Sequence, residues 1–373
     1  MKPVGTNILN PWREECAVFG IWGDPEAAQM TYLGLYAQQH RGQEAAGIVS
    51  LRDENHIVHK GFGLVGEVFQ EADLQRLEGS AAMGHVRYST TGENHVNNIQ
   101  PLTANLNTGP VALAHNGNIV NSQLLKKQLQ TEGAIFQGTN DTECLLHLLA
   151  RHPSQDPVIC LKDTVTQLTG AYSVVMLTKD RLIALRDPLG FRPLVLGKRS
   201  LDGGGEAWTV ASETCAFDLI GAKYVREVEP GEILWIDDKG VHSERFSAPS
   251  PKTAFCVFEH VYFSRPDSVV FGESVYEARK RMGRRLAQEN PVEADVVIPV
   301  PDSGVPAAIG YSMESGIPFE LGIIRNHYIG RTFIQPSQSI RSFGVKIKLN
   351  PQSAVLKGRR VVVVDDSLVR GTT

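Results

Sequence analysis

The sequence contains no apolar run approaching the roughly 18 residues that a membrane-spanning helix needs. Residues 1–10 also lack the apolar centre of a signal peptide, so we expect a cytoplasmic protein. The sequence also has no large excess of either charge, because 37 basic and 41 acidic residues leave a net charge of -4. This balance offers no basic face for a nucleic acid. We therefore expect partners that are neither membranes nor nucleic acids.

Cysteine is also sparse, and its spacing argues against a disulfide framework. The five cysteines are odd in number and include no close pair: Cys16, Cys144, Cys160, Cys215 and Cys256. This arrangement fits a reducing compartment. What the sequence does have is length, since 373 residues with 42% hydrophobic content can form more than one core.

The hydrophobic pattern changes once along the chain, at the Pro- and Ser-rich segment 247–252. Before it, many short strands alternate with helices expected at 27–39, 122–132 and 142–151. This mixture predicts layered sheets with helices on their outer faces.

After that segment the pattern becomes β-α-β. The spacing predicts helices at 275–288 and 305–315, and strands at 295–300, 320–324 and 360–364. The unbroken valines at 361–364 are typical of a strand that is covered on both faces of a parallel sheet. We place a leader at 1–15, one domain at 16–247 and a second domain at 254–373.

The segment 14–22 puts a thiol at the front of an apolar, strand-like run. If residues 1–15 were removed, Cys16 would carry a thiol and a free α-amine, with reference pKa values of about 8.5 and about 7.7–8.0. The amine could then accept the thiol proton, which would place nucleophile and base on one residue. The alternative is a small buried core residue, and the segment alone favours that alternative.

Four other residues supply the parts of a glutamine-hydrolysing site when they are taken together. Arg87 ends a strand and can hold an α-carboxylate, while Asp141 can pair with an α-ammonium. Asn116 and Gly117 offer N–H donors for an oxyanion hole, where one donor lowers the barrier by about 3 kcal/mol. Taken singly, these residues also fit a strand-end arginine, a hairpin turn and a helix N-cap.

The end of the sequence joins an apolar strand to an acidic loop that is rich in Gly and Thr. Asp365 and Asp366 follow the valines, and the loop continues to Thr373. Such a loop offers N–H and hydroxyl groups to a phosphate, and the carboxylates can accept ribose hydroxyls or help to hold Mg²⁺. The alternative is an acidic turn without a ligand. Segment 299–304 ends another strand, which we expect on the same face.

In these motifs and their order, the sequence resembles the N-terminal-nucleophile glutamine amidotransferases, and within them the amidophosphoribosyltransferase family. The resemblance extends from Cys16 through segments 39–44, 84–90 and 115–118 into the second domain. It implies a four-layer αββα glutaminase domain of α+β type. An α/β phosphoribosyltransferase domain with a parallel sheet follows, and we expect it to be incomplete at its C-terminus.

The resemblance also implies that the leader is cleaved to expose Cys16 as the nucleophile. Asn116 and Gly117 are then the oxyanion residues. The implied glutamine-binding residues are Arg41, Gly42, Arg87 and Asp141.

For the second domain the resemblance implies three groups of residues. The metal site comprises Ser303, Asp365 and Asp366. The loop that binds phosphoribosyl pyrophosphate comprises Asp366, Ser367, Arg370, Gly371, Thr372 and Thr373. A lid over that substrate comprises Arg331, Thr332, Phe333, Ile334 and Gln335.

Mg²⁺ is the implied cofactor. Cys256 matches an iron–sulfur ligand of the family, but a four-iron cluster needs about four thiolates, so we expect a cluster only in a longer chain. The implied small-molecule partners are glutamine, phosphoribosyl pyrophosphate and purine nucleotides acting as feedback inhibitors. The resemblance further implies a homo-oligomer, namely a tetramer.

The function implied is the glutamine-dependent amination of phosphoribosyl pyrophosphate, the first committed step of purine synthesis. Three alternatives stay open. One is a truncated chain that only hydrolyses glutamine, or is inactive, because the sequence stops inside the phosphate loop. Another is a glutaminase with a different acceptor, such as one that makes glucosamine phosphate or asparagine. The third is a non-catalytic regulator that senses the sugar pyrophosphate.

Overall fold

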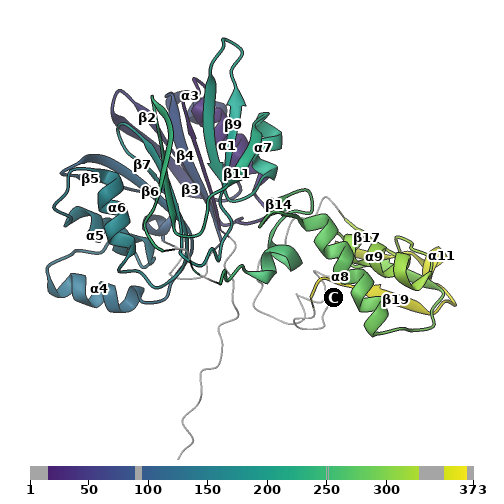
Figure 1. The fold of residues 1–373 in the computed structure, drawn as a ribbon. Helices are drawn as coiled ribbons and strands as arrows, with labels where there is room; N and C mark the ends of the chain where they lie inside the picture. The colour runs from purple at the N-terminus through teal and green to yellow at the C-terminus, as the bar shows by residue number, and fades with distance from the viewer. Residues whose placement is uncertain (1–15, 89–94, 249, 251, 327–347, 368–373) are drawn as a thin grey trace, which may run out of the picture. The chain divides into compact units, whose positions relative to one another are not determined.

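The computed structural model describes residues 16–88, 95–248, 250, 252–326 and 348–367. By its contacts the chain divides into two compact units, Met1–Cys256 and Val257–Thr373, which Figure 1 shows in one ribbon. None of the helices described is both long enough and apolar enough to cross a bilayer. The predicted leader at 1–15 lies outside the described residues, and the functional roles of the two domains stay predictions at this point.

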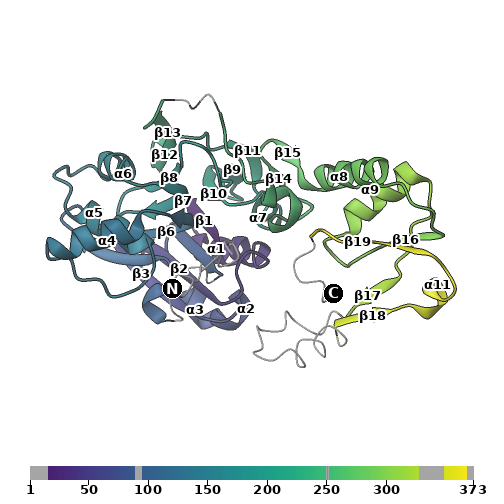
Figure 2. The same ribbon diagram turned by 90° about the horizontal axis from the view of Figure 1, so that it is seen from below.

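Two antiparallel sheets occupy the middle of the first unit (Figures 1 and 2). The seven-stranded sheet has the order β11 (Lys223–Glu227), β9 (Val195–Ser200), β10 (Glu206–Ala211), β1 (Ala17–Trp22), β4 (Ala81–Arg87), β2 (Ala45–Arg52), β3 (Asn55–Phe62). The six-stranded sheet has the order β13 (Gly240–Arg245), β12 (Glu232–Asp237), β8 (Leu182–Arg186), β7 (Gly170–Leu177), β6 (Gly109–Ile119), β5 (Leu102–Leu106).

Alternation along the strands gives each sheet two apolar faces. Val18 and Met83 of one sheet pack in the same buried cluster as Ala112 and Val175 of the other, so the inner faces meet as a shared core. The outer faces pack against helices. The helices α1 (Ala27–Ala37) and α7 (Cys215–Ile220) contribute to the core of the seven-stranded sheet, and α4 (Ser122–Thr131), α5 (Thr142–Ala150) and α6 (Pro157–Val165) to that of the six-stranded sheet.

This order of helix, sheet, sheet and helix confirms the predicted mixture of helices and layered sheets. The three predicted helices are α1, α4 and α5, each within two residues of its expected bounds. Short elements complete the unit: α2 (Val65–Val68), α3 (Glu71–Arg76) and the 3₁₀ turn η1 (Val96–Asn98). At the contact between α1 and β1, a Cβ on Gly34 would lie 2.4 Å from the Phe19 ring, so only glycine permits this approach.

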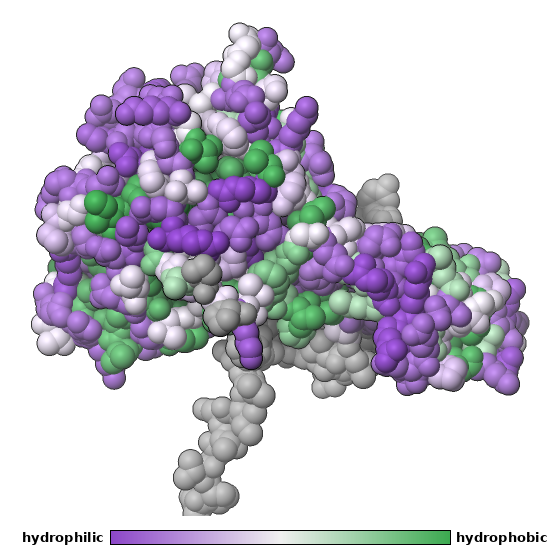
Figure 3. Space-filling model, viewed as in Figure 1, coloured by the Kyte–Doolittle hydropathy of each residue, from purple (hydrophilic) through white to green (hydrophobic). Residues whose placement is uncertain are grey.

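The second unit contains two long helices, α8 (Val275–Glu289) and α9 (Val305–Ser315), which lie side by side in Figure 2. Strand β16 (Val296–Pro299) pairs in parallel with β19 (Val361–Val364), as the β-α-β pattern predicted. A separate antiparallel pair consists of β17 (Ile323–Arg325) and β18 (Leu349–Pro351). The surface over α8 in Figure 3 is largely hydrophilic.

Four short elements complete the second unit. They are the π-helical turn η2 (Glu259–Phe263), the two-stranded pair β14 (Val269–Val270) and β15 (Glu273–Ser274), and α11 (Ser353–Leu356).

The valines of β19 are typical of a strand that is covered on both faces, yet Val363 is 55% exposed. Val362 and Val364 pack with Val297 and Ala308 on the side of α9, and helices cover only that side among the described residues. The apolar run predicted the strand, and the described part of the chain covers one of its two faces.

Glycines allow α8 and α9 to pack closely. A Cβ on Gly310 would lie 1.9 Å from the carbonyl oxygen of Lys280, and one on Gly283 would lie 1.9 Å from that of Ala307. We predict that Gly310→Ala lowers the free energy of unfolding by about 1–3 kcal/mol, because the helices must separate. Helix propensity alone predicts the opposite sign, a gain of about 0.5–1 kcal/mol. Calorimetric unfolding of the second unit decides between these signs.

The matched control is Gly203→Ala, because a Cβ at Gly203 would meet nothing within 4 Å. Its transition temperature should equal that of the parent protein. A Gly310→Ala variant that unfolds at or above the parent temperature would show that the helices separate at no cost.

Candidate active site

Cys16 lies one residue before β1, and its side chain is partly exposed. Strand β1 pairs with β4 in the register Ala17 to Val86. Continued by one residue, this register places Cys16 opposite Arg87, so the two side chains share the inner face of the sheet. The thiol donates to the carbonyl oxygen of Tyr88, with an Sγ to O distance of 3.6 Å. Cys16 is therefore not the inert core residue that its segment alone favoured.

The guanidinium of Arg87 is buried and carries an unbalanced charge. The residue is only 4% exposed, and its two terminal nitrogens have no hydrogen-bond partner among the described residues. An arginine cannot lose its charge, and a buried unpaired charge is costly. The planar fork of donors suits a carboxylate, so this position fits an anionic group of a ligand.

Asn116 and Gly117 lie on β6, across the core from β1. Asn116 is fully buried, its Nδ2 is 3.5 Å from Ser212 Oγ, and its Oδ1 has no partner among the described residues. Gly117 has a φ of +145°, and a Cβ there would lie 2.0 Å from the carbonyl oxygen of Ala171. Only glycine fits this backbone. The predicted oxyanion donors are thus adjacent, on a strand whose conformation is fixed.

Asp141 precedes α5, but its side chain makes no capping hydrogen bond to the helix. The sequence left open that Asp141 is simply a helix N-cap, and the structure does not support that alternative. One carboxylate oxygen accepts the Ile119 N–H at 2.8 Å, which ties the helix to the end of β6. The other oxygen lies 3.7 Å from His115 Nδ1. The cap is instead Asn140, whose side chain accepts the Glu143 N–H at 2.9 Å. Asp141 thereby places a buried negative charge beside the strand of Asn116 and Gly117.

Arg41 lies behind Cys16 and is fully buried. Its Nε donates to the carbonyl oxygen of Cys16 at 3.1 Å, and a terminal nitrogen donates to Glu213 at 2.6 Å. The neighbouring Gly42 fits closely against β4, because a Cβ there would lie 2.6 Å from the carbonyl carbon of Val86. The glutamine-binding role expected for these two residues stays a prediction, and their contacts in the structure are with the chain itself.

Glu213 is a fully buried carboxylate that the sequence analysis did not single out. His40 Nε2 lies 2.8 Å from the Glu213 oxygen that Arg41 also contacts. Burial by itself would raise the pKa of Glu213, but the charges of His40 and Arg41 and their hydrogen bonds outweigh it and hold that pKa well below its usual range. Glu213 is therefore ionised at neutral pH.

His85 is a second residue that the sequence analysis passed over. It is fully buried on β4, two residues before Arg87. Burial, assisted by the charges of Arg87 and His115, lowers the pKa of His85 to about 3. His85 is consequently neutral at pH 7 and adds no charge beside Arg87.

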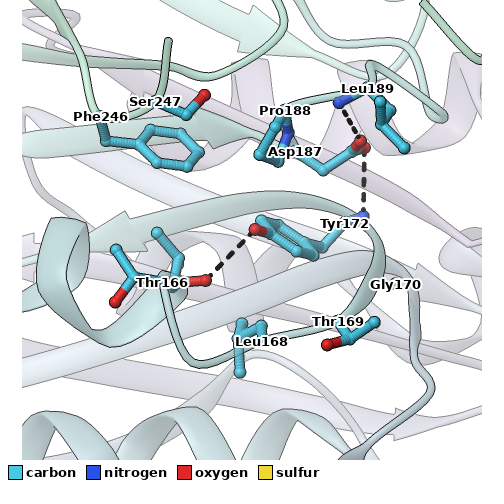
Figure 4. A pocket seen from close by; sticks show the side chains of 11 residues that line it. Thr166, Leu168, Thr169, Gly170, Tyr172, Asp187, Pro188, Leu189, Phe246 and Ser247 are labelled. Atoms are coloured by element: carbon cyan, nitrogen blue, oxygen red, sulfur yellow. Dashed lines mark hydrogen bonds between the residues drawn. The ribbon is translucent and has the colours of Figure 1, made fainter. Parts of the chain in front are cut away.

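A cavity of about 370 Å³ in the first unit contains none of the predicted site residues (Figure 4). Its wall is mostly apolar, and the buried Asp187 carboxylate at its edge accepts main-chain N–H groups of Tyr172, Leu189 and Phe191. Burial raises the pKa of Asp187, although these hydrogen bonds oppose it. The carboxylate is thus fully engaged by the backbone.

In the second unit, the three predicted metal ligands line one pocket of about 210 Å³. Ser303, Asp365 and Asp366 surround it together with side chains of α8 and α9. Burial raises the pKa of Asp365, and the adjacent Asp366 contributes to the rise. Ser367 donates a hydrogen bond to the Asp366 carboxylate. The remaining predicted residues of the phosphate loop and the lid lie outside the described residues: Arg331, Thr332, Phe333, Ile334, Gln335, Arg370, Gly371, Thr372 and Thr373.

Comparison with known proteins shows which family the chain belongs to. A family model described as a glutamine amidotransferase domain matches residues 85–218. The amidophosphoribosyltransferase of Bacillus subtilis is 53% identical over 361 residues, which are 96% of this chain and 75% of that protein. The chain belongs to the amidophosphoribosyltransferase family. A chloroplastic member from Glycine max is 55% identical over 97% of this chain, which spans only 63% of that relative's length.

A solved structure from the family gives the same result for the fold. It is the glutamine phosphoribosylpyrophosphate amidotransferase from B. subtilis complexed with ADP and GMP. It matches with a TM-score of 0.88 and 52% identity, over 96% of this chain and 76% of that chain.

The cofactors implied for the family fit the described residues unequally. Two carboxylates and a hydroxyl in one pocket are suitable ligands for Mg²⁺, which is commonly held by one or two carboxylates together with substrate phosphates. An iron–sulfur cluster stays an expectation for a longer chain, and the described part of this chain brings together no group of three His, Cys, Asp or Glu side chains that could hold a metal ion. Cys256 instead lies 3.8 Å from a terminal nitrogen of Arg192.

The two buried arginines yield a stability prediction. Arg87→Met should raise the free energy of unfolding of the unliganded protein by about 1 kcal/mol or more, because it removes a buried charge that has no partner among the described residues. Arg41→Met should lower that free energy by about 3–5 kcal/mol, since it removes the buried cation paired with Glu213 and leaves that carboxylate beside His40. Urea unfolding of both variants without glutamine measures the two values. Equal destabilisation by the two substitutions would mean that Arg87 has a partner within the chain.

Proposed function

We propose that this protein catalyses the glutamine-dependent amination of 5-phosphoribosyl 1-pyrophosphate. The products are 5-phosphoribosylamine, glutamate and pyrophosphate, in the first committed step of purine synthesis. The observation that carries the proposal is the buried guanidinium of Arg87, whose terminal nitrogens have no hydrogen-bond partner in the described part of the chain and which lies on the same sheet face as the Cys16 thiol. We assign the N-terminal-nucleophile glutaminase fold to the first unit and a phosphoribosyltransferase domain to the second. The relatives named above carry this activity in their names.

The first step is hydrolysis of the glutamine amide. After cleavage of the leader, the α-amine of Cys16 takes the thiol proton, and the sulfur attacks the side-chain carbonyl carbon. The negative charge on the carbonyl oxygen is stabilised by N–H donors of Asn116 and Gly117. Collapse breaks the C–N bond and releases ammonia, and water then hydrolyses the thioester to glutamate. Arg87 binds the α-carboxylate of the substrate, and Asp141 binds its α-ammonium.

The second step joins ammonia to the sugar. Ammonia attacks the anomeric carbon of phosphoribosyl pyrophosphate, and the C–O bond to pyrophosphate breaks. When bound, Mg²⁺ neutralises charge on the departing pyrophosphate. Ser303, Asp365 and Asp366 would hold that ion, and the loop from Asp366 onward would bind the ribose phosphate.

Regulation and assembly belong to the same proposal. The relative from B. subtilis was solved with ADP and GMP, which supports purine nucleotides as feedback inhibitors of this protein. We also propose a homo-oligomer, with a tetramer as the expected form. The expected cytoplasmic location stays a prediction, since relatives from plants are named as chloroplastic.

Substitution of the nucleophile tests the first step. We predict that Cys16→Ser abolishes glutamine hydrolysis, because a hydroxyl at this position is a far weaker nucleophile. The matched control is Cys144→Ser, at a cysteine that is 1% exposed in the core of the six-stranded sheet. Glutamate release by the control should stay close to that of the parent protein. Parent-like activity in Cys16→Ser would refute the nucleophile assignment.

Mass spectrometry of the active protein checks the base. The amine can serve only if Cys16 is the first residue, so a fully active protein that still carries Met1 would contradict this part of the mechanism.

Removal of one acidic side chain tests the second step. We predict that Asp366→Asn lowers the rate of pyrophosphate release at least tenfold at limiting phosphoribosyl pyrophosphate, because the amide that replaces this proposed Mg²⁺ ligand carries no charge. Glutamine hydrolysis should be retained. Glu320→Gln, at an exposed carboxylate of the same unit, is the matched control. Pyrophosphate release is measured over a range of Mg²⁺ concentrations, and an unchanged dependence would remove Asp366 from the metal site.

A further inference from the structure

The turn between β10 and α7 places Ser212 and Glu213 directly behind the strand of the nucleophile. Ser212 Oγ accepts the Val18 N–H at 3.0 Å, and the Ser212 N–H donates to the carbonyl oxygen of Val18 at 3.1 Å. Two hydrogen bonds thus hold β1 two residues beyond Cys16. Ser212 Oγ also lies 3.5 Å from Asn116 Nδ2, so the same turn contacts the oxyanion strand.

Glu213 is linked to the main chain of Cys16 through the side chain of Arg41. It is 2.6 Å from a terminal nitrogen of Arg41, whose Nε is 3.1 Å from the carbonyl oxygen of Cys16. Both contacts belong to one rigid, planar guanidinium. The position of the Glu213 carboxylate therefore sets the orientation of the group that holds the main chain of Cys16.

The surroundings leave Arg41 little freedom to reorient. Arg41 is fully buried, and Gly42 lies so close to β4 that a Cβ on it would be 2.7 Å from the main-chain nitrogen of Arg87. The Glu213 N–H donates to Gln38 Oε1 at 3.2 Å, which joins the acidic residue to the end of α1 as well. Both partners of the ion pair are therefore anchored through their own backbones.

We propose that Glu213 is a positioning residue for the nucleophile, acting through Arg41 on the main chain of Cys16. This inference rests on the proposed glutaminase activity. The carbonyl group of Cys16 is one bond from the Cα that bears the thiol and the amine, so its orientation affects both. Displacement of a reacting group by about 1 Å can cost about 100-fold in rate. In this arrangement Arg41 holds the main chain of the nucleophile.

The test is steady-state glutamine hydrolysis by E213Q in the full chain. Glutamine has the shape of glutamate but no charge, so it cannot hold the guanidinium as firmly. We expect kcat to fall by about 10- to 100-fold, while KM for glutamine changes less than about threefold because Arg87 and Asp141 are untouched. The rate at which iodoacetamide alkylates Cys16 should fall as well, with a changed pH profile.

The matched control is E232Q. Glu232 is also a buried carboxylate, 5% exposed, and it is paired with Arg226 at 2.7 Å in another part of the same unit. This variant loses an ion pair without a link to Cys16, and the Arg226 side chain of that pair is 37% exposed, so its kcat should stay within about threefold of the parent value. Urea unfolding of both variants separates a fall in kcat from a loss of stability.

A second variant, R41K, keeps the positive charge but lacks the planar fork, and it should show the same fall in kcat as E213Q. Parent-like kcat in both E213Q and R41K overturns the proposal. Failure of both to fold while E232Q folds also overturns it, since the role is then structural. An inactive parent protein would refute the glutaminase itself, whereas an active parent, an inactive C16S and a parent-like E213Q would refute only this inference.

Discussion

The position of β1 between β10 and β4 is the constraint on which the rest of the first unit depends. Its outward residues pack under α1, its inward residues join the core between the sheets, and both edges are occupied by hydrogen-bonded neighbours. A central strand of this kind cannot shift by one residue without turning its apolar side chains to the wrong face. Cys16 lies one residue before this strand, so the core that stabilises the fold also fixes the thiol.

The sequence predicted much of this arrangement, for identifiable physical reasons. Periodicity located the main helices, and the valines at 361–364 located a strand. Arg87, Asn116, Gly117 and Asp141 were selected because their side chains or backbone offer chemistry that a core does not need. The structure places Arg87 on β4 of one sheet and Asn116 and Gly117 on β6 of the sheet that packs against it, and the Asp141 carboxylate accepts a hydrogen bond at the end of β6. Their roles with glutamine stay predictions.

Other features could not be predicted because they arise from contacts distant in sequence. Glu213 is 172 positions from Arg41, and an acidic residue between a strand and a helix is usually solvent-exposed. Burial of His85 depends on which face of β4 meets the second sheet, which alternation alone does not decide. The apolar run at 361–364 does not predict the exposure of Val363 either, since such a run carries no information on which of its faces a helix covers.

Two buried arginines lie near Cys16, and they differ in whether the described chain supplies an anion to compensate their charge. A guanidinium cannot be neutralised by losing its proton, so each one buried in this core needs a compensating anion. For Arg41 the chain supplies Glu213, and the pair stabilises the fold. For Arg87 the described chain supplies no acceptor to either terminal nitrogen, and the neighbouring His85 is kept neutral by burial. Arg87 is therefore suited to the carboxylate of a ligand, and an amino-acid carboxylate held there would lie on the same face as the thiol; its role with glutamine stays a prediction.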